Sequence, residues 1–343
     1  MKQQKLCVLL SILMLLTFIL SACSGTGTTE VTAEQSITST DQESDHPETE
    51  PEITEDLVKG TYKHVVIIGV DGAGAYFKNA NTPNIDRIFE NGAVTYKMLT
   101  SNPTISAQCW GSLLHGVTPE YHGLNNTIAA STPYPLDSKF PSFFKVIREN
   151  NSDAVLASFC NWFPINAGMV ENQIGVQKAP PCADDATLAQ EVCNYLSQKT
   201  PTALFVQFNE PDIVGESKGF GTKAHLDQIT LSDTYIGQIY QALESKGILD
   251  DTLFIVTADH GGNGKTHGGW TDTEKYVMFA ACGKMIEKSI PESIEIRDIA
   301  AIVLFALGYD CPDTWTARVP SNLFVGVTAK TRPVYADSDS KTK

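Results

Sequence analysis

The chain has 343 residues, of which 42% are hydrophobic and 19% are charged. This composition supports one large or two ordinary globular domains with a sizeable buried core, and it excludes a collagen-like or globally disordered chain. The formal net charge of −15 at pH 7 argues against a nucleic-acid-binding surface, because such a surface relies on a basic face.

The first 22 residues are predicted to be a lipoprotein signal peptide. Lys2 and Lys5 form a basic start, and the mostly apolar run that follows is short for a membrane-spanning helix. The run ends in Leu-Ser-Ala-Cys, which resembles a bacterial lipobox. The resemblance implies cleavage before Cys23 and a diacylglyceryl anchor on its sulfur, so we expect the protein at the outer face of a cell membrane. An uncleaved membrane helix is the alternative.

Residues 23–58 are predicted to be a disordered, acidic spacer. Between Glu30 and Asp56 there are ten acidic side chains and no Lys or Arg. Such a stretch buries too little apolar area to offset its ordering entropy, and its like charges keep it extended. We therefore expect it to hold the folded body, residues 59–334, away from the membrane. A flexible tail is predicted for residues 335–343.

Within the body, short apolar runs alternate with helical patterns. Nearly continuous apolar runs predict buried strands, and apolar residues at helical spacing predict helices. The predicted strands are 64–70, 154–159, 203–208, 252–257 and 276–281. One predicted helix begins at Pro83 and is closed by Gly92. The other predicted helices are 107–114, 184–198, 226–245 and 296–307. This alternation predicts an α/β fold with a mainly parallel central sheet between helices, and residues 125–200 leave room for a small cap.

Acidic residues follow three of the predicted strands. They are Asp71, Asp212 and Asp259, and the last is followed by His260. In such sheets the carboxyl ends of the strands meet at one edge, where ligands bind. These carboxylates would therefore lie close together and repel one another unless a cation neutralised them. Asp and His ligands without Cys favour a divalent cation such as Zn or Mn. His267 follows across a Gly-rich turn that can bring its ring back to the same place. Taken singly, each acid is more typical of a helix N-cap or a surface group.

The segment from Asn102 to Gly123 resembles the nucleophile segment of the alkaline phosphatase superfamily, in particular its type I phosphodiesterase/nucleotide pyrophosphatase branch. It contains Pro-Thr-Ile-Ser near its start and Pro-Glu-Tyr-His-Gly at its end. Val-Asp-Gly at 70–72, Glu-Pro-Asp at 210–212 and Asp-His-Gly-Gly at 259–262 extend the likeness over nearly the whole body in family order. The resemblance implies an alkaline phosphatase-like fold and a phosphoric ester hydrolase.

The resemblance also implies two divalent metal ions, with zinc as the expected metal. One ion is expected to be held by Asp71, Asp259, His260 and the hydroxyl of Ser106. The other is expected to be held by Asp212, Glu216 and His267. Relatives carry a His at the position of Glu216. A Glu one helical turn after Asp212 shares its face and can bind a metal, but it is a harder, charged ligand that makes Mn, Mg or Ca an alternative there.

Ser106 is the nucleophile that the resemblance implies. It is expected to attack phosphorus and form a phosphoseryl intermediate that water then cleaves, with the two metal ions holding the attacking and leaving oxygens. Ser106 also stands at the start of a predicted helix, where N–H groups favour a phosphate. An ordinary N-cap serine is the alternative, and Thr104 is the nearest competing hydroxyl.

Cys109 marks a second departure from the family pattern. Phosphodiesterase relatives carry at this position an Asn that binds a substrate phosphate oxygen, and Gln108 can replace it only with a shift of register. We expect Cys109 to be a buried thiol. It lacks the Cys-x-Pro-x-Arg context that a sulfatase requires.

Two other functions are compatible with the sequence. Because Glu216 and Cys109 depart from the family's catalytic pattern, the chain is also compatible with a non-catalytic surface lipoprotein that binds a phosphorylated envelope component. A phospho-group transferase acting on envelope polymers is the third possibility. The expected partners are a phosphate-ester substrate and a membrane reached through the lipid anchor.

The cysteines of the body allow two interpretations. An exported protein can form a disulfide between Cys160 and Cys182 or Cys193, and buried free thiols are equally compatible with the sequence.

Overall fold

The computed structural model describes residues 54–291, 293–328 and 332. The predicted signal peptide, Cys23, the spacer as far as residue 53 and the tail from residue 335 lie outside the described residues. In the part of the chain that is described, no helix combines the length and the hydropathy needed to cross a membrane.

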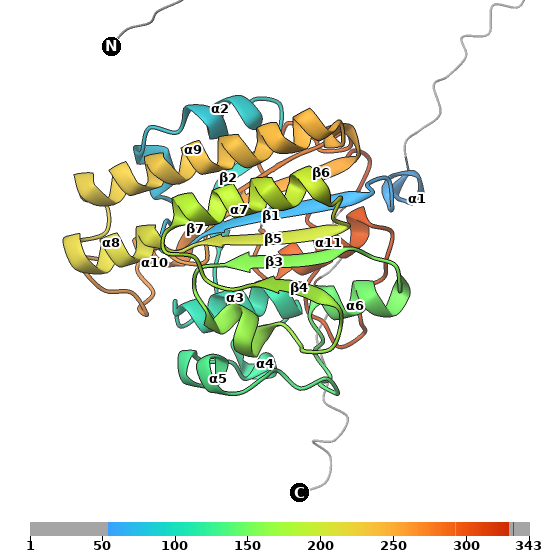
Figure 1. Cartoon of the computed structure of the whole chain (residues 1–343), viewed down its shortest axis with the longest axis horizontal. Coiled ribbons are helices and arrows are strands. Elements are labelled where there is room, and N and C mark those ends of the chain that lie inside the picture. The colour runs from blue at the N-terminus through green and yellow to red at the C-terminus, as the bar shows by residue number, and fades with distance from the viewer. Residues whose placement is uncertain (1–53, 292, 329–331, 333–343) are drawn as a thin grey trace, which may run out of the picture. The chain divides into compact units, whose positions relative to one another are not determined.

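A seven-stranded sheet runs through the body (Figure 1), with its strands in the order β2-β7-β6-β1-β5-β3-β4. The strands are β1 (His64–Val70), β2 (Ala93–Leu99), β3 (Leu156–Cys160), β4 (Val176–Ala179), β5 (Ala203–Phe208), β6 (Thr252–Thr257) and β7 (Tyr276–Cys282). β1 pairs in parallel with both β5 and β6, and β7 runs antiparallel to both β6 and β2. The sheet is therefore mainly parallel, as predicted.

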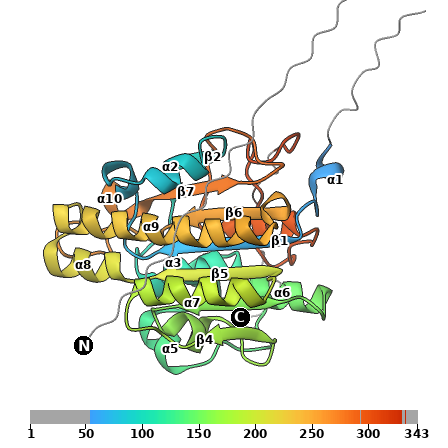
Figure 2. The same ribbon diagram turned by 45° about the horizontal axis from the view of Figure 1, so that its top comes forward.

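Helices cover both faces of this sheet (Figures 1 and 2). One layer contains α2 (Pro83–Ile88), α7 (Asp185–Gln198) and α9 (Lys223–Lys246), and the other contains α3 (Ser106–His115), α6 (Phe143–Asn150) and α11 (Asp298–Ala306). The shorter helices are α1 (Glu55–Val58), η1 (Tyr76–Asn79), α4 (Pro119–His122), α5 (Asn126–Ser131), η2 (Ile165–Met169), α8 (Glu210–Lys218), η3 (Leu249–Asp251) and α10 (Asp272–Lys275). The predicted α/β fold is confirmed.

The three central strands are the most completely buried part of the chain. Every residue of β5 and β6 is buried, as is every residue of β1 after His64. Strands covered by helices on both faces need apolar side chains in both directions, which is why these three lie at the residues predicted from their continuous apolar runs. Because they are parallel, their carboxyl ends meet at one edge of the sheet and bring the segments that follow them together.

Several predicted boundaries differ from the structure. The helix that begins at Pro83 ends at Ile88, and a turn in which the Gly92 N–H donates to the Phe89 carbonyl leads into the edge strand β2. The strand predicted at 154–159 is Leu156–Cys160, and the helix predicted at 296–307 begins at Asp298. The antiparallel strand β2 and the short edge strand β4 lack the long apolar runs of the central strands, so the pattern did not reveal them.

The segment 125–200, in which we placed a small cap, contributes mainly to the body. It supplies β3, β4, α6 and α7, and leaves α5 and η2 packed against each other beside them. The body also starts earlier than residue 59. Residues 55–58 form α1, Val58 is fully buried, and the Gly60 N–H donates to the Phe305 carbonyl. The last four residues of the predicted spacer are therefore folded, because Val58 supplies an apolar side chain to the core.

All six cysteines of the described body are free thiols, with Cys109 and Cys160 buried. The structure thus favours the free-thiol alternative over a Cys160 disulfide.

Candidate active site

Two of the three strand ends place their acidic residues in one buried group. Asp71 follows β1 directly, and Asp259 and His260 follow β6 after one intervening alanine. The Nε2 atom of His260 lies 3.6 Å from Asp71 Oδ1 and 3.3 Å from Asp259 Oδ2. All three side chains are at most 1% exposed. These ligand-type atoms are close enough together to bind one metal ion.

Ser106 lies beside this group. Its Oγ is 3.2 Å from His260 Nε2, and the residue is the first of α3. Ile105 takes the N-cap position with an extended backbone and makes no side-chain cap, so Ser106 does not act as an ordinary N-cap serine. The adjacent Ala107 N–H donates to Asn126 Oδ1 at 3.1 Å. The hydroxyl of Ser106 therefore lies beside His260 at the acidic edge of the sheet.

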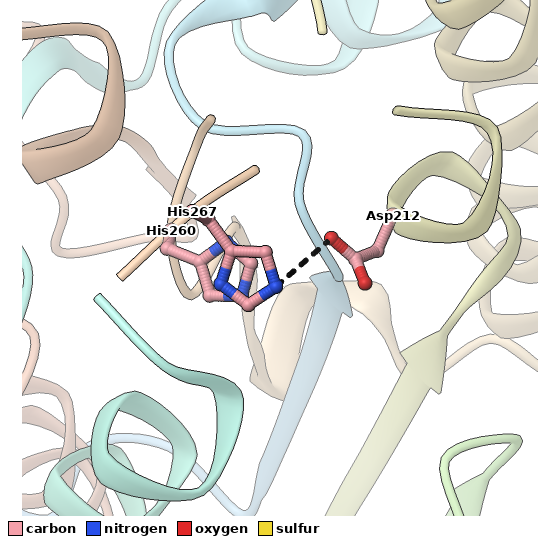
Figure 3. A group of neighbouring side chains, drawn as sticks. All are labelled: Asp212, His260 and His267. Carbon is pink, nitrogen blue, oxygen red and sulfur yellow. Dashed lines mark ion pairs between the residues drawn. The ribbon is translucent and has the colours of Figure 1, made fainter. Parts of the chain in front are cut away.

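A second group forms around His267. Its Nε2 lies 4.0 Å from Asp212 Oδ1 and 3.5 Å from Glu216 Oε1. Figure 3 shows Asp212 facing the two histidine rings, which stack with centroids 4.0 Å apart and an angle of 13° between their planes. Asp212 and Glu216 are one turn apart on α8, which explains why both reach the same ring. The side chain of Glu216 is 55% exposed, so this group opens to solvent.

Three carboxylate oxygens in these groups are buried without a hydrogen-bond partner. They are Asp71 Oδ1, Asp212 Oδ1 and Asp259 Oδ2. The other oxygen of Asp71 accepts hydrogen bonds from Trp110 and Gln207, and the other oxygen of Asp259 accepts one from the Gly72 N–H. Unpaired buried carboxylate oxygens are unfavourable unless a cation is close to them. The residues present therefore fit divalent cations in two groups, Asp71 with Asp259 and His260, and Asp212 with His260 and His267, whose ligand-type atoms lie within 4.8 Å of one another. Glu216 adjoins the second group through its contact with His267.

The electrostatics of the buried carboxylates lead to the same conclusion. Burial, together with the charge of Asp259, raises the pKa of Asp71 well above its usual range, and burial with the charge of Asp212 does the same to the pKa of Asp259. Burial and the charges of Asp71 and Glu216 raise the pKa of Asp212 to about 9. With this pKa the Asp212 carboxyl retains its proton at neutral pH unless a cation is bound, and burial disfavours the charged forms of Asp71 and Asp259 in the same way. A bound metal ion would offset these costs and replace the proton.

Backbone carbonyls hold both histidines with Nε2 towards the carboxylates. His260 Nδ1 lies 2.9 Å from the Gly261 carbonyl, and His267 Nδ1 lies 2.8 Å from the Thr104 carbonyl. A proton on Nδ1 that is donated to the carbonyl leaves the Nε2 lone pair free, which is the form that binds a metal.

Thr104 connects the Ser106 segment to the His267 loop. Its hydroxyl accepts from the Gly268 N–H at 2.8 Å and donates to the Gly269 carbonyl at 3.0 Å. These bonds occupy the hydroxyl that was the nearest competitor to Ser106. Cys109 is fully buried, with Sγ 3.8 Å from the Ser101 carbonyl, as expected for a buried thiol.

Sequence reasoning missed the side chains that orient the ligands. Trp110, Gln207 and Thr104 each hold a candidate ligand or its loop through a hydrogen bond from a different element. In the sequence, a tryptophan inside an apolar helix pattern is indistinguishable from a core residue. For Gln207, the one available signal was a polar side chain within a strand that is otherwise continuously apolar.

Comparisons with known proteins give consistent results. The sequence model of the type I phosphodiesterase/nucleotide pyrophosphatase family matches residues 65–139 and 148–300. The solved structure of murine ectonucleotide pyrophosphatase/phosphodiesterase 5 is similar with a TM-score of 0.60 and 13% identity, covering 72% of this chain and 96% of that one. The 2-O GAG sulfatase BT1596 is similar with a TM-score of 0.60 and 16% identity, covering 73% and 72%. At such identities these structures show a shared fold.

A curated protein also matches. It is GPI ethanolamine phosphate transferase 2 of Aspergillus fumigatus, 20% identical over 245 residues, which are 69% of this chain and 32% of that protein. The chain thus spans about a third of the length of this relative.

Proposed function

Because the chain belongs to the type I phosphodiesterase/nucleotide pyrophosphatase family, we propose that it is a metal-dependent hydrolase of phosphodiesters or phosphomonoesters with Ser106 as its nucleophile. The observation that carries this proposal is the position of Ser106 Oγ, 3.2 Å from His260 Nε2, beside two groups of side chains that fit divalent cations. A hydroxyl at a helix start, next to carboxylates that need a cation, suits attack on a phosphate ester.

The proposed reaction has two steps. The Ser106 oxygen forms a bond to phosphorus as the alkoxide of the ester leaves, and water then cleaves the phosphoseryl ester and releases the phosphate product. Divalent cations, when bound, supply positive charge that lowers the pKa of the Ser106 hydroxyl and offsets charge on the phosphoryl oxygens. Asp71, Asp259 and His260 would hold one cation beside Ser106. Asp212, Glu216 and His267 would hold the other.

We propose zinc at the Asp71 group, and zinc, Mn, Mg or Ca at the Glu216 group, because Glu216 adds a hard, charged oxygen ligand. Glu216→His is therefore expected to raise the affinity for Zn relative to Mn by about tenfold, or about 1.4 kcal/mol. Competition titrations of the purified protein against a zinc chelator and a manganese chelator give this ratio.

Glu191→His is the matched control, because Glu191 is exposed on α7, a helix that carries none of the candidate ligands. It is expected to leave the ratio unchanged. An unaltered Zn-to-Mn ratio in Glu216→His would show that Glu216 does not bind a metal.

The transferase alternative has a specific observation in its favour. The curated relative described above is named for the transfer of ethanolamine phosphate. A transferase would use the same first step, and an alcohol in place of water would then take the phosphoryl group from Ser106. The two functions therefore differ in the second acceptor and share the same site.

One assay separates these functions. The purified full-length protein is supplied with bis-p-nitrophenyl phosphate or p-nitrophenyl phosphate, with added Zn or Mn, and bound metal is measured by elemental analysis. The hydrolase predicts metal-dependent release of p-nitrophenolate and of free phosphate product. Transfer to an added alcohol that exceeds transfer to water would favour the transferase. A chain that binds no metal and releases no product would be the non-catalytic binder.

A further inference from the structure

A cavity of about 450 Å³ lies beside the edge strand β2, outside the two candidate metal groups. We call it the edge cavity. The residues used below come from three separate elements, namely Tyr76, Lys78 and Asn79 on η1, Tyr96 and Lys97 on β2, and Tyr276 at the start of β7. Figure 2 shows β2, β7 and α10 together at one side of the body. The volume is within the range of small-molecule sites.

A β-bulge brings two consecutive residues of β2 to this cavity. Thr95 pairs with Phe279 and Met98 with Val277, so β2 contains one more residue than β7 over this stretch. Neighbouring side chains of a regular strand point to opposite faces, and a bulge redirects one of them. Here Tyr96 and Lys97 both line the edge cavity, and the Lys97 N–H donates to the Thr95 hydroxyl at 3.2 Å within the bulge.

The edge cavity carries positive charge on an acidic protein. Lys78 and Lys97 are exposed, and neither forms an ion pair with any described residue. The acidic residue of the wall, Asp272, is paired with Lys275 Nζ at 2.6 Å. Two ammonium groups therefore remain available to an anion, although the chain as a whole has a net charge of −15.

The tyrosines add ring surfaces and hydroxyl groups. Tyr76 donates its hydroxyl to the Gly262 carbonyl, which fixes this wall to the loop after His260. Tyr96 and Tyr276 are partly buried, and within the described residues their hydroxyls have no hydrogen-bond partner. With the Asn79 carboxamide and the lysines, they surround the cavity with hydrogen-bond donors and acceptors. Tyrosine rings give the apolar contact that the face of a sugar ring needs.

We propose that the edge cavity binds an anionic sugar, that is, a ring with several hydroxyl groups and one carboxylate or phosphate. Lys78 and Lys97 would bind the anionic group, and the tyrosine and asparagine side chains would contact the ring and its hydroxyls. The proposal uses none of the candidate metal ligands, so it stands or fails independently of the proposed hydrolase activity.

The test is a calorimetric titration of the purified full-length protein with glucuronate. Saturable binding is expected, and neutral glucose is expected to bind at least tenfold more weakly because it lacks the anion. Lys78→Glu and Lys97→Glu are each expected to weaken glucuronate binding at least tenfold. Glucose 6-phosphate, titrated into the Ser106→Ala variant to prevent turnover, shows whether a phosphate or a carboxylate is preferred.

Two controls restrict the result to the edge cavity. Lys199→Glu changes an exposed lysine after α7, and Asp212→Asn alters the candidate metal group, and both are expected to bind glucuronate as the unaltered chain does. Circular dichroism verifies that each variant is folded. Absence of saturable binding, equal binding of glucose, or binding unaffected by both cavity lysine variants would overturn the proposal. Tighter binding of UMP through the same lysines would assign the cavity to nucleotides and overturn the sugar.

Discussion

Ser106→Ala is expected to reduce the turnover of a phosphate ester by at least ~1,000-fold, because removal of an activated nucleophile has effects of this size or larger. The Ser106 hydroxyl is the one placed 3.2 Å from His260 Nε2, and the neighbouring Thr104 hydroxyl is already bonded to Gly268 and Gly269. No described hydroxyl with such a position is left to replace it. The measurement is kcat/KM with bis-p-nitrophenyl phosphate at saturating metal.

The same variant has a second readout. Intact-mass spectrometry of the unaltered chain, quenched with acid during turnover of bis-p-nitrophenyl phosphate, is expected to show the mass of one added p-nitrophenyl phosphoryl group, because only one of the two p-nitrophenolates leaves in the first step. With p-nitrophenyl phosphate the added mass is that of one phosphoryl group, and Ser106→Ala is expected to lose both adducts. Ser197→Ala, an exposed serine on α7, is the matched control and should retain both activity and adduct. If Ser106→Ala hydrolysed the ester at an undiminished rate, Ser106 would not be the nucleophile.

Asp259→Asn is expected to change metal affinity and metal-free stability in opposite directions. The Asn oxygen can still accept the Gly72 N–H, and its NH₂ group replaces the unpaired oxygen Oδ2. At neutral pH the folded metal-free chain must either bury the charge of Asp259 or take up a proton that the unfolded chain does not hold, because burial raises the pKa of this carboxyl. Asn avoids both costs, so the free energy of unfolding of the metal-free protein should increase and its Tm should rise by a few degrees. The variant also loses a ligand, so affinity for the metal should fall at least ~100-fold.

Thermal unfolding in chelator and metal titration by calorimetry measure the two effects. The matched control is Asp227→Asn, which removes an exposed charge on α9 that pairs with Lys223. Its metal affinity should be unchanged. A destabilised metal-free Asp259→Asn protein would show that the buried charges are already compensated within the chain. Unchanged metal affinity would show that Asp259 is not a ligand.

The central part of the fold could be predicted because its constraint is local. A strand covered on both faces must be apolar at every position, whatever its neighbours are, so β1, β5 and β6 were visible as continuous runs. β2 has a different pattern, since it lies at the sheet edge and contains a bulge. Neither its pairing with β7 nor its extra residue leaves a local periodic signal.

The candidate metal groups follow from the same logic. Once the strands are parallel, residues directly after them share one edge, and Asp71, Asp259 and His260 must be close together. Glu216 could be placed with Asp212 because one helical turn separates them.

Only the tertiary structure decided which side chains orient and surround these groups. Trp110 and Gln207 reach Asp71 from a helix and a strand far apart in the sequence. The edge cavity likewise collects Tyr76, Tyr96 and Tyr276 from three elements. The sequence alone determined the buried strands and the acidic residues that follow them. A strand covered on both faces needs an apolar side chain at each position, so its signal is local. A hydrogen-bond partner or a cavity wall depends on which distant segments meet, and that depends on the packing of the whole body.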